Sequence, residues 1–147
     1  MTNLIRWYIT EVCADDDFDL SDVLATAQLA HLGQTRRSGE PYLEHPLEVA
    51  RIVRSYYPGD KILCTAALLH DTLEDAVAQG NVKDNQEMEE LIRGSYLDPS
   101  DGLRALDIVM ALTHEKNEPY VQYVVDLAGN PSALRIKLAD MLHNLKS

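Results

Sequence analysis

The sequence predicts an all-α fold, a bundle of about seven or eight helices. Apolar residues recur with the spacing of one helix face nearly throughout the chain, and no convincing run of alternating β-branched residues appears. Proline, asparagine and aspartate stand where successive helices would begin. These observations favour helices packed around a shared core over any sheet-based fold.

The first elements are expected near the N-terminus. A short helix near residues 3–12 is followed by an acidic turn at residues 15–17. A second helix is predicted from about residue 21 to residue 33. One face of this second helix carries four apolar residues, which are Val23, Leu24, Ala27 and Ala30.

The next segments alternate between loop and helix. Residues 34–40 are polar and basic, which predicts a loop. Pro46 fits the first turn of a third helix that ends before Pro58. Asp60 is suited to cap a fourth helix, which would continue through His70 and Asp71.

The sequence of the second half of the chain predicts four further helices. Residues 77–85 read as a loop, and Asn130 is a plausible cap for the last helix. The expected helices cover residues 87–96, residues 98–112, a segment starting at Pro119, and residues 131–146. The last helix has leucines along one side, at Leu134, Leu138, Leu142 and Leu145.

Composition limits the classes of function. The 147 residues suit a single domain over residues 1–147, and 46% hydrophobic residues suffice for one core. The formal net charge of −11 argues against binding duplex nucleic acid, which favours a basic face. A small phosphorylated ligand remains compatible with this charge, because a bound cation reverses the local field.

The chain carries no sign of export or membrane insertion. Its apolar stretches are far shorter than a membrane span, and Arg6 and Glu11 interrupt any signal-peptide pattern. Cys13 and Cys64 lack the spacing of a redox or metal motif, so two reduced thiols are expected. These features predict a cytoplasmic protein. They leave its oligomeric state open.

Polar groups with metal-binding chemistry gather directly after an apolar stretch. In the run AALLHDTLEDA, one imidazole and three carboxylates fall within six residues, at His70, Asp71, Glu74 and Asp75. On a continuous helix, positions four apart would lie one turn apart and form two adjacent rows. Buried charge is costly unless it is paired or bound to metal. The cluster therefore predicts a metal site.

Two distant residues complete a candidate ligand set. His45 precedes the proline at the start of the third helix, and Asp140 lies in the otherwise apolar run IKLADMLHNL. Histidine and aspartate together suit Mn²⁺, Fe²⁺, Zn²⁺ and Co²⁺. The predicted ligands are His45, His70, Asp71 and Asp140. Such a set leaves open positions for water and substrate, as catalytic sites do.

Each residue also has a simpler structural interpretation. His45 alone would fit an ordinary helix-end residue, and Asp140 alone could pair with Arg135 or Lys137. The basic pair in the loop, Arg36 and Arg37, could be a solvated turn. The structural interpretation must explain several costly polar insertions into apolar helices at once, so the combination favours metal.

Three motifs resemble a known family. The order His…His-Asp…Asp, with the flanking segments GQTRRSGEPYLEHPLEVARIV, AALLHDTLEDA and IKLADMLHNL, is similar to HD-domain metal phosphohydrolases of the RelA/SpoT type. The resemblance covers about residues 27–145. It implies an HD-domain bundle and Mn²⁺-dependent removal of the 3′-pyrophosphate of ppGpp or pppGpp.

The resemblance also assigns roles to residues. It implies that the four ligands named above hold the metal and that Glu74 and Asp75 form the catalytic acid pair. It further implies that four residues contact the nucleotide, which are Arg36, Arg37, Ser38 and Asn144. Arg36 would stack on the base, since a guanidinium is planar and cationic.

Three functions stay open at this point. The first is a phosphohydrolase acting on ppGpp-like nucleotides. The second keeps the chemistry and changes the substrate to another nucleoside phosphate. The third is a nucleotide-binding module that no longer turns over, against which the retained pair Glu74 and Asp75 argues. An acidic chain makes nucleic acid the weakest substrate.

Overall fold

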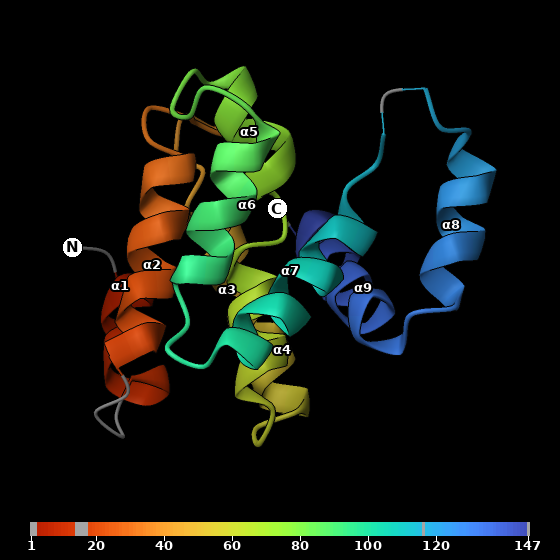
Figure 1. The fold of residues 1–147 in the computed structure, drawn as a ribbon. Coiled ribbons are helices and arrows are strands. Elements are labelled where there is room, and N and C mark those ends of the chain that lie inside the picture. Colours follow the sequence, from red (N-terminus) through yellow and green to blue (C-terminus); the bar gives the residue numbers. More distant parts are fainter. Residues whose placement is uncertain (1–2, 14–17, 116, 147) are drawn as a thin grey trace.

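The computed structural model describes residues 3–13, 18–115 and 117–146, which form the predicted all-helical bundle (Figure 1). In chain order the elements are α1 (Asn3–Trp7), the π-helical turn η1 (Tyr8–Val12), α2 (Phe18–Ala30), α3 (Glu44–Tyr56), α4 (Lys61–Leu68), α5 (Thr72–Ala78), α6 (Asn85–Gly94), α7 (Pro99–Leu112), α8 (Tyr120–Ala128) and α9 (Pro131–Lys146). Within these residues, extended pairing is limited to one bridge between Thr35 and Pro41. The acidic turn expected at residues 15–17 lies outside the described part of the chain.

The centre of the bundle consists of α3, α4, α7 and α9. Helix α3 lies against both α4 and α9, and α4 also contacts α7. Helix α2 covers α4, α5 and α6, whereas α8 stands at the far edge and contacts only α9 and α7 closely (Figure 1). The predicted face of α2 is buried, at Val23, Leu24, Ala27 and Ala30. Segments distant in sequence therefore meet where α3, α4 and α9 converge.

Both predicted helix caps, Asp60 and Asn130, are present, and Asp98 caps a further helix. Asp60 accepts a hydrogen bond from the backbone N–H of Leu63 at 3.0 Å, and Asp98 accepts one from Ser100 at 2.9 Å. Asn130 accepts one from the N–H of Ala133 at 3.1 Å. Each cap satisfies a backbone donor that has no partner inside the helix. These polar side chains therefore set where α4, α7 and α9 begin.

The predicted fourth helix is interrupted at the His-Asp pair. Helix α4 ends at Leu68 and α5 begins at Thr72, so His70 and Asp71 lie in a tight turn. His70 Nδ1 bonds the carbonyl of Ala67 at 2.6 Å, and Thr72 Oγ1 donates to that of Leu69 at 2.7 Å. These side chains replace the helical bonds that the carbonyls lose. The expectation of two continuous side-chain rows is therefore wrong, and the turn brings the pair to a helix end.

Helix α9 packs through a face other than its leucine side. Its buried residues include Ala133, Ile136 and Asp140, whereas Leu138 is 57% exposed and Leu145 is 84% exposed. Small side chains at the packed face let α9 approach α3 closely, since the interaxial distance depends on the residues at the contact. Because this face points into the bundle, it carries Asp140 to the convergence of α3 and α4.

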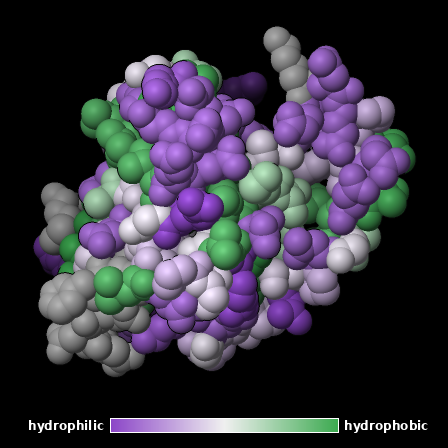
Figure 2. All heavy atoms as spheres, viewed as in Figure 1, coloured by the Kyte–Doolittle hydropathy of each residue, from purple (hydrophilic) through white to green (hydrophobic). Residues whose placement is uncertain are grey.

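The surface mixes polar and apolar regions. In the view of Figure 2, hydrophilic residues cover the area over α5 and α6, and hydrophobic residues reach the surface at the edge formed by α8. Val121 of that helix is 75% exposed and Val125 is 58% exposed. No helix of the described residues has the length and apolar character needed to cross a bilayer.

Candidate metal centre

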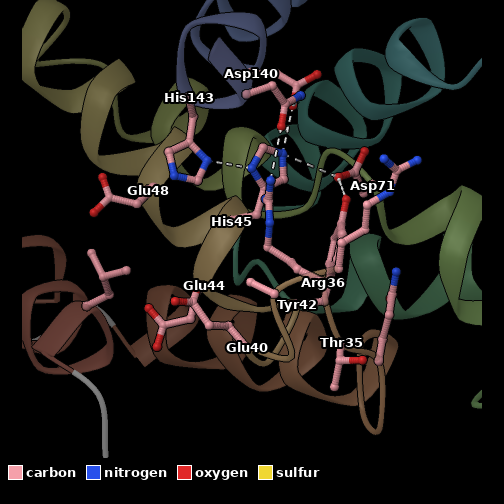
Figure 3. Close-up of a pocket in the computed structure, with 15 residues that line it drawn as sticks. Thr35, Arg36, Glu40, Tyr42, Glu44, His45, Glu48, Asp71, Asp140 and His143 are labelled. Carbon is pink, nitrogen blue, oxygen red and sulfur yellow. Dashed lines mark hydrogen bonds and ion pairs between the residues drawn. The ribbon is translucent and has the colours of Figure 1, made fainter. Parts of the chain in front are cut away.

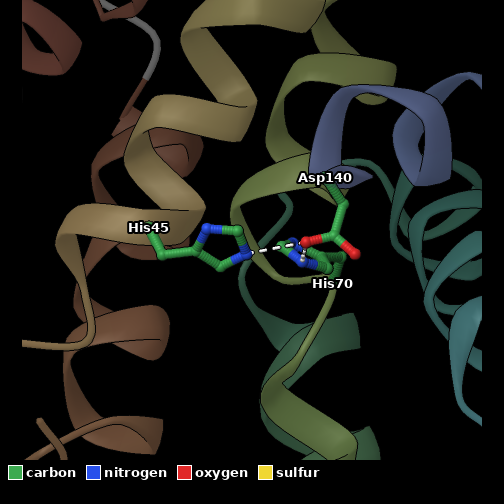
Figure 4. Close-up of side chains that lie close together, drawn as sticks. All are labelled: His45, His70 and Asp140. Carbon is green, nitrogen blue, oxygen red and sulfur yellow. Dashed lines mark hydrogen bonds and ion pairs between the residues drawn. The ribbon is translucent and has the colours of Figure 1, made fainter. Parts of the chain in front are cut away.

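The orientation of His70 is fixed by the turn that carries it. Its Nδ1 lies 2.6 Å from the carbonyl oxygen of Ala67, so Nδ1 carries the hydrogen and donates. Its Nε2 then presents a lone pair, is fully buried, and has no hydrogen-bond partner among the described residues. A buried unpartnered acceptor is costly unless something binds it. This orphaned nitrogen is directed toward His45 and Asp140 (Figure 4).

The second imidazole is contributed by the first turn of α3. His45 is buried, and its Nε2 lies 2.7 Å from Oδ1 of Asp140. Its Nδ1 lies 2.7 Å from Nδ1 of His143 on α9, and the two rings stack with centroids 5.0 Å apart. A partner on the outer nitrogen is how proteins orient metal-binding histidines. His143 therefore positions His45 from outside the cluster.

Asp140 uses both oxygens. Oδ1 faces the two histidines, 2.7 Å from Nε2 of His45 and 3.5 Å from Nε2 of His70. Oδ2 accepts a bond from the ammonium of Lys137 at 3.2 Å. The pairing with Lys137 anticipated as a structural alternative is therefore present, and it occupies only one oxygen. The other oxygen faces the histidines and also accepts a hydrogen bond from the side-chain amide of Asn144 at 3.3 Å.

Asp71 approaches the same point from the turn. Its Oδ2 lies 3.1 Å from Nε2 of His70 and 3.9 Å from Nε2 of His45. The hydroxyl of Tyr42 donates to this oxygen at 2.5 Å. Burial raises the pKa of the Tyr42 hydroxyl, and the Asp71 charge raises it further, so the hydroxyl stays protonated as a donor. Tyr42 thus orients the carboxylate.

The electrostatics keep the carboxylates ionised. Burial alone would raise the pKa of Asp71, but His70 and the Tyr42 hydroxyl outweigh it and hold that pKa below its ordinary range. Burial is likewise outweighed at Asp140, where the hydrogen bond from His45 is foremost among the effects that lower the pKa. Two ionised carboxylates facing two imidazole nitrogens form a donor set that suits a divalent cation.

The positions of the side chains, independently of any resemblance to a family, fit a bound metal ion. Donor atoms of His45, His70 and Asp140 lie within 4.8 Å of one another in a buried position (Figure 4). The tautomer of His70 leaves its inner nitrogen unprotonated, as metal binding requires. Asp71 lies beside this group and offers a further oxygen. The cluster is therefore consistent with a divalent metal site.

Two more carboxylates flank the cluster on the first turn of α5. Glu74 accepts a hydrogen bond from the backbone N–H of His114 at 2.8 Å, and Asp75 accepts one from the amide of Gln34 at 3.1 Å. Burial raises the pKa of both carboxyls, and these hydrogen bonds offset part of that effect. Carboxyls with raised pKa values next to a metal site are suited to proton transfer.

A cavity of about 1030 Å³ opens beside the cluster (Figure 3). The four predicted nucleotide-binding residues line it, which are Arg36, Arg37, Ser38 and Asn144. The Arg36 guanidinium donates to the side-chain oxygen of Asn144 at 3.3 Å, which joins the loop to α9. A positive φ of 89° at Gly39 lets the loop turn back, and glycine adopts that conformation without strain. The cavity can hold a nucleotide-sized ligand.

The structure brings together side chains from three segments whose meeting the sequence predicted. His45, His70, Asp71 and Asp140 converge, and Glu74 and Asp75 lie beside them. The structure adds two residues outside the predicted set, His143 beside His45 and Tyr42 beside Asp71. The hydrogen bond from Tyr42 to Asp71 joins positions 29 residues apart, and no sequence spacing signals such a contact.

Gln34 was missed altogether. Its amide contacts Asp75, which is 41 positions away in the chain. It is the first residue of the predicted polar, basic loop, where a polar side chain carries no specific signal. Only the packing of α2 against α5 reveals the contact.

The comparisons with known proteins agree with this geometry. The HD domain family matches residues 23–147. A protein of Escherichia coli K12, bifunctional (p)ppGpp synthase/hydrolase SpoT, is 33% identical over 149 residues, which is 100% of this chain and 20% of that protein. A GTP pyrophosphokinase of Myxococcus xanthus is 32% identical over 145 residues, covering 95% of this chain and 18% of that protein. The chain thus spans about one fifth of the length of these relatives.

Proposed function

The chain belongs to the HD domain family, and from this membership we propose that it is a metal-dependent phosphohydrolase acting on a nucleotide. The observation that carries the proposal is the buried Nε2 of His70, which has no hydrogen-bond partner and faces His45 and Asp140. An unpartnered nitrogen beside two ionised carboxylates is expensive in a structural core and useful in a metal site.

We propose that four side chains hold the cation, which are His45, His70, Asp71 and Asp140. Mn²⁺ is the proposed resident ion, with Fe²⁺, Zn²⁺ and Co²⁺ as alternatives that suit the same donors. When bound, such an ion supplies Lewis acidity toward a phosphoryl oxygen and lowers the pKa of a bound water. We further propose that residues 1–147 act as one domain, in a reducing compartment such as the cytoplasm, as the sequence predicts.

The protein's own groups perform the remaining steps. One carboxylate of the pair Glu74 and Asp75 takes the proton of the attacking water, and the other holds a proton for the leaving group. Burial raises the pKa of both carboxyls, so each holds a proton more readily than an exposed carboxyl does. Arg36 in the cavity wall binds phosphate oxygens or stacks on the base.

The leading substrate is a ppGpp-like nucleotide, cleaved at its 3′-pyrophosphate. Two relatives support this choice by their names, the SpoT protein described above and a guanosine-3′,5′-bis(diphosphate) 3′-pyrophosphohydrolase of Escherichia coli O157:H7, 33% identical over 149 residues. Arg36, Arg37 and the 1030 Å³ cavity also suit a large anionic ligand.

One feature of the cavity favours a second candidate. Three glutamates line the wall on the α3 side, at positions 40, 44 and 48 (Figure 3). Burial raises the pKa of Glu44, and repulsion from the carboxylates of Glu40 and Glu48 raises it further. Such a wall disfavours a second phosphate group. A nucleoside phosphorylated at one position is therefore the alternative substrate.

The test is turnover of a substrate panel. Purified protein with Mn²⁺ is incubated with ppGpp, GTP, deoxynucleoside triphosphates and nucleoside monophosphates. GDP plus pyrophosphate from ppGpp supports the leading candidate. Phosphate from monophosphates supports the second. Tight nucleotide binding without turnover of any compound refutes the hydrolase and favours a binding module.

A further inference from the structure

A buried histidine lies behind the catalytic pair and is unused by the mechanism above. His31 directly follows α2, and its side chain is fully buried, with 0% exposed. Its ring packs against that of Tyr42, with centroids 4.9 Å apart. Its Nδ1 lies 3.8 Å from Oδ2 of Asp75, too far for a direct hydrogen bond. The side-chain amide of Gln34 is bonded to both groups and bridges them.

The hydrogen bonds of Gln34 have fixed directions. An ionised carboxylate only accepts, so the contact of 3.1 Å with Asp75 requires the amide NH₂ of Gln34 as donor. The amide oxygen then faces His31 Nδ1 at 2.9 Å, and this oxygen can only accept. His31 must therefore carry its hydrogen on Nδ1. One carboxylate thus determines the orientation of an amide and the tautomer of an imidazole.

The chain of contacts leaves one oxygen of Asp75 unused. Oδ2 is held by Gln34, and Oδ1 accepts no hydrogen bond from the described residues. Glu74 is anchored in the same way, by one oxygen to the His114 backbone. Each member of the pair therefore has one oxygen fixed and one oxygen open. The anchors differ, because Asp75 depends on two side chains that mutation can remove.

We infer that His31 and Gln34 are positioning residues that hold the Asp75 carboxylate in the orientation needed for proton transfer. This role rests on the proposed function, in which Asp75 works on the attacking water or the leaving group. A neutral relay restrains the carboxylate without adding a cation, which would weaken it as a base. Fixing a reacting group within a narrow range of geometries is a substantial part of catalysis.

The kinetic test is a cycle of variants at His31 and Asp75. We expect His31→Leu to lower kcat about tenfold with KM and bound metal unchanged. His31→Asn, whose amide nitrogen replaces Nδ1, should recover most of the loss. In the Asp75→Asn protein, His31→Leu should cause no further loss, because the relay then has no base to position. Gln28→Leu, an exposed position of α2, serves as the control and should leave kcat unchanged.

A second measurement does not depend on turnover. Nitrogen NMR of the histidines should show His31 protonated on Nδ1, and Gln34→Leu should abolish that preference. Protonation on Nε2, or a spectrum unaffected by Gln34→Leu, would overturn the relay. An equal loss from His31→Leu with and without Asp75 would overturn the positioning role. The expected tautomer in a protein that hydrolyses no nucleotide would refute the proposed function instead, and with it any catalytic use of an intact relay.

Discussion

The metal cluster and the cavity wall are adjacent but built differently. The cluster consists of buried and partly buried side chains from α3, α9 and the turn between α4 and α5, each held by neighbouring side chains or backbone. The wall is formed by a surface loop, whose shape comes from backbone bonds such as that from Arg36 N–H to the Glu40 carbonyl at 2.8 Å. A buried polar cluster needs its cation to offset desolvation, whereas an exposed loop is stable without ligand. Under the proposed function, the core would therefore determine the chemistry and the surface loop the choice of substrate.

The largest effect should come from removing a ligand in the cluster. Asp71→Ala removes one proposed metal ligand and the carboxylate that accepts the hydrogen bond of the Tyr42 hydroxyl. We expect loss of metal uptake and a fall in turnover of at least about a thousandfold, since both depend on the cation. Elemental analysis and steady-state kinetics measure the two effects. Asp107→Ala, an exposed aspartate of α7, is the matched control. If Asp71→Ala keeps full activity without bound metal, the cluster has no part in the reaction.

A smaller loss is expected beside the cluster. Glu74→Ala removes a carboxyl that contacts none of the four proposed ligands by hydrogen bond, since its anchor is the His114 backbone. The metal content should stay at the wild-type level while kcat falls about a hundredfold, the usual contribution of a general acid or base. Metal analysis and kcat are compared on the same preparation. Retention of full kcat would show that this carboxylate has no catalytic part.

The cavity wall should respond through binding. Arg36→Ala deletes a guanidinium that lines the cavity and contacts Asn144. We expect KM to rise about tenfold with kcat little changed, because a charge-assisted hydrogen bond to phosphate contributes about that much. The KM of Arg36→Lys should lie between those of the wild type and Arg36→Ala, since an ammonium keeps the charge but lacks the planar guanidinium fork. A kcat defect with unchanged KM would place Arg36 in the chemistry and erase the contrast between the two regions.

The smallest expected effect is on the pH dependence of kcat. Burial raises the pKa of Glu74 and of Asp75, so each carboxyl takes up a proton at a higher pH than an exposed one. If the ionised form is the base, kcat should fall with decreasing pH before the ordinary carboxyl range of about 4 is reached. Glu74→Gln or Asp75→Asn should remove this acid limb. An acid limb confined to the ordinary range would contradict the raised values.

The same contrast explains what the sequence could predict. Charged residues in apolar helices are costly, so Asp140 and the pair at positions 70 and 71 were recognisable from the sequence. Caps at Asp60 and Asn130 were equally recognisable, because they satisfy backbone donors at known positions.

Other features depend on tertiary contacts. The break between α4 and α5 arises from bonds made by His70 and Thr72 to nearby carbonyls, and helical periodicity continues through it. The relay through Gln34 and the bond from Tyr42 join distant segments, which periodicity does not report. The exposed leucine side of α9 shows that an apolar row need not be the packed face.

The most direct test is metal stoichiometry with Mn²⁺. Isothermal titration of metal-free protein, together with elemental analysis, should give one tightly bound ion for the wild type and none for Asp140→Ala or His70→Ala. Binding of that ion should also raise the melting temperature of the wild type alone. A wild-type protein that binds no divalent cation, or variants that bind it as well as the wild type, would contradict the central claim that these side chains meet to hold a metal.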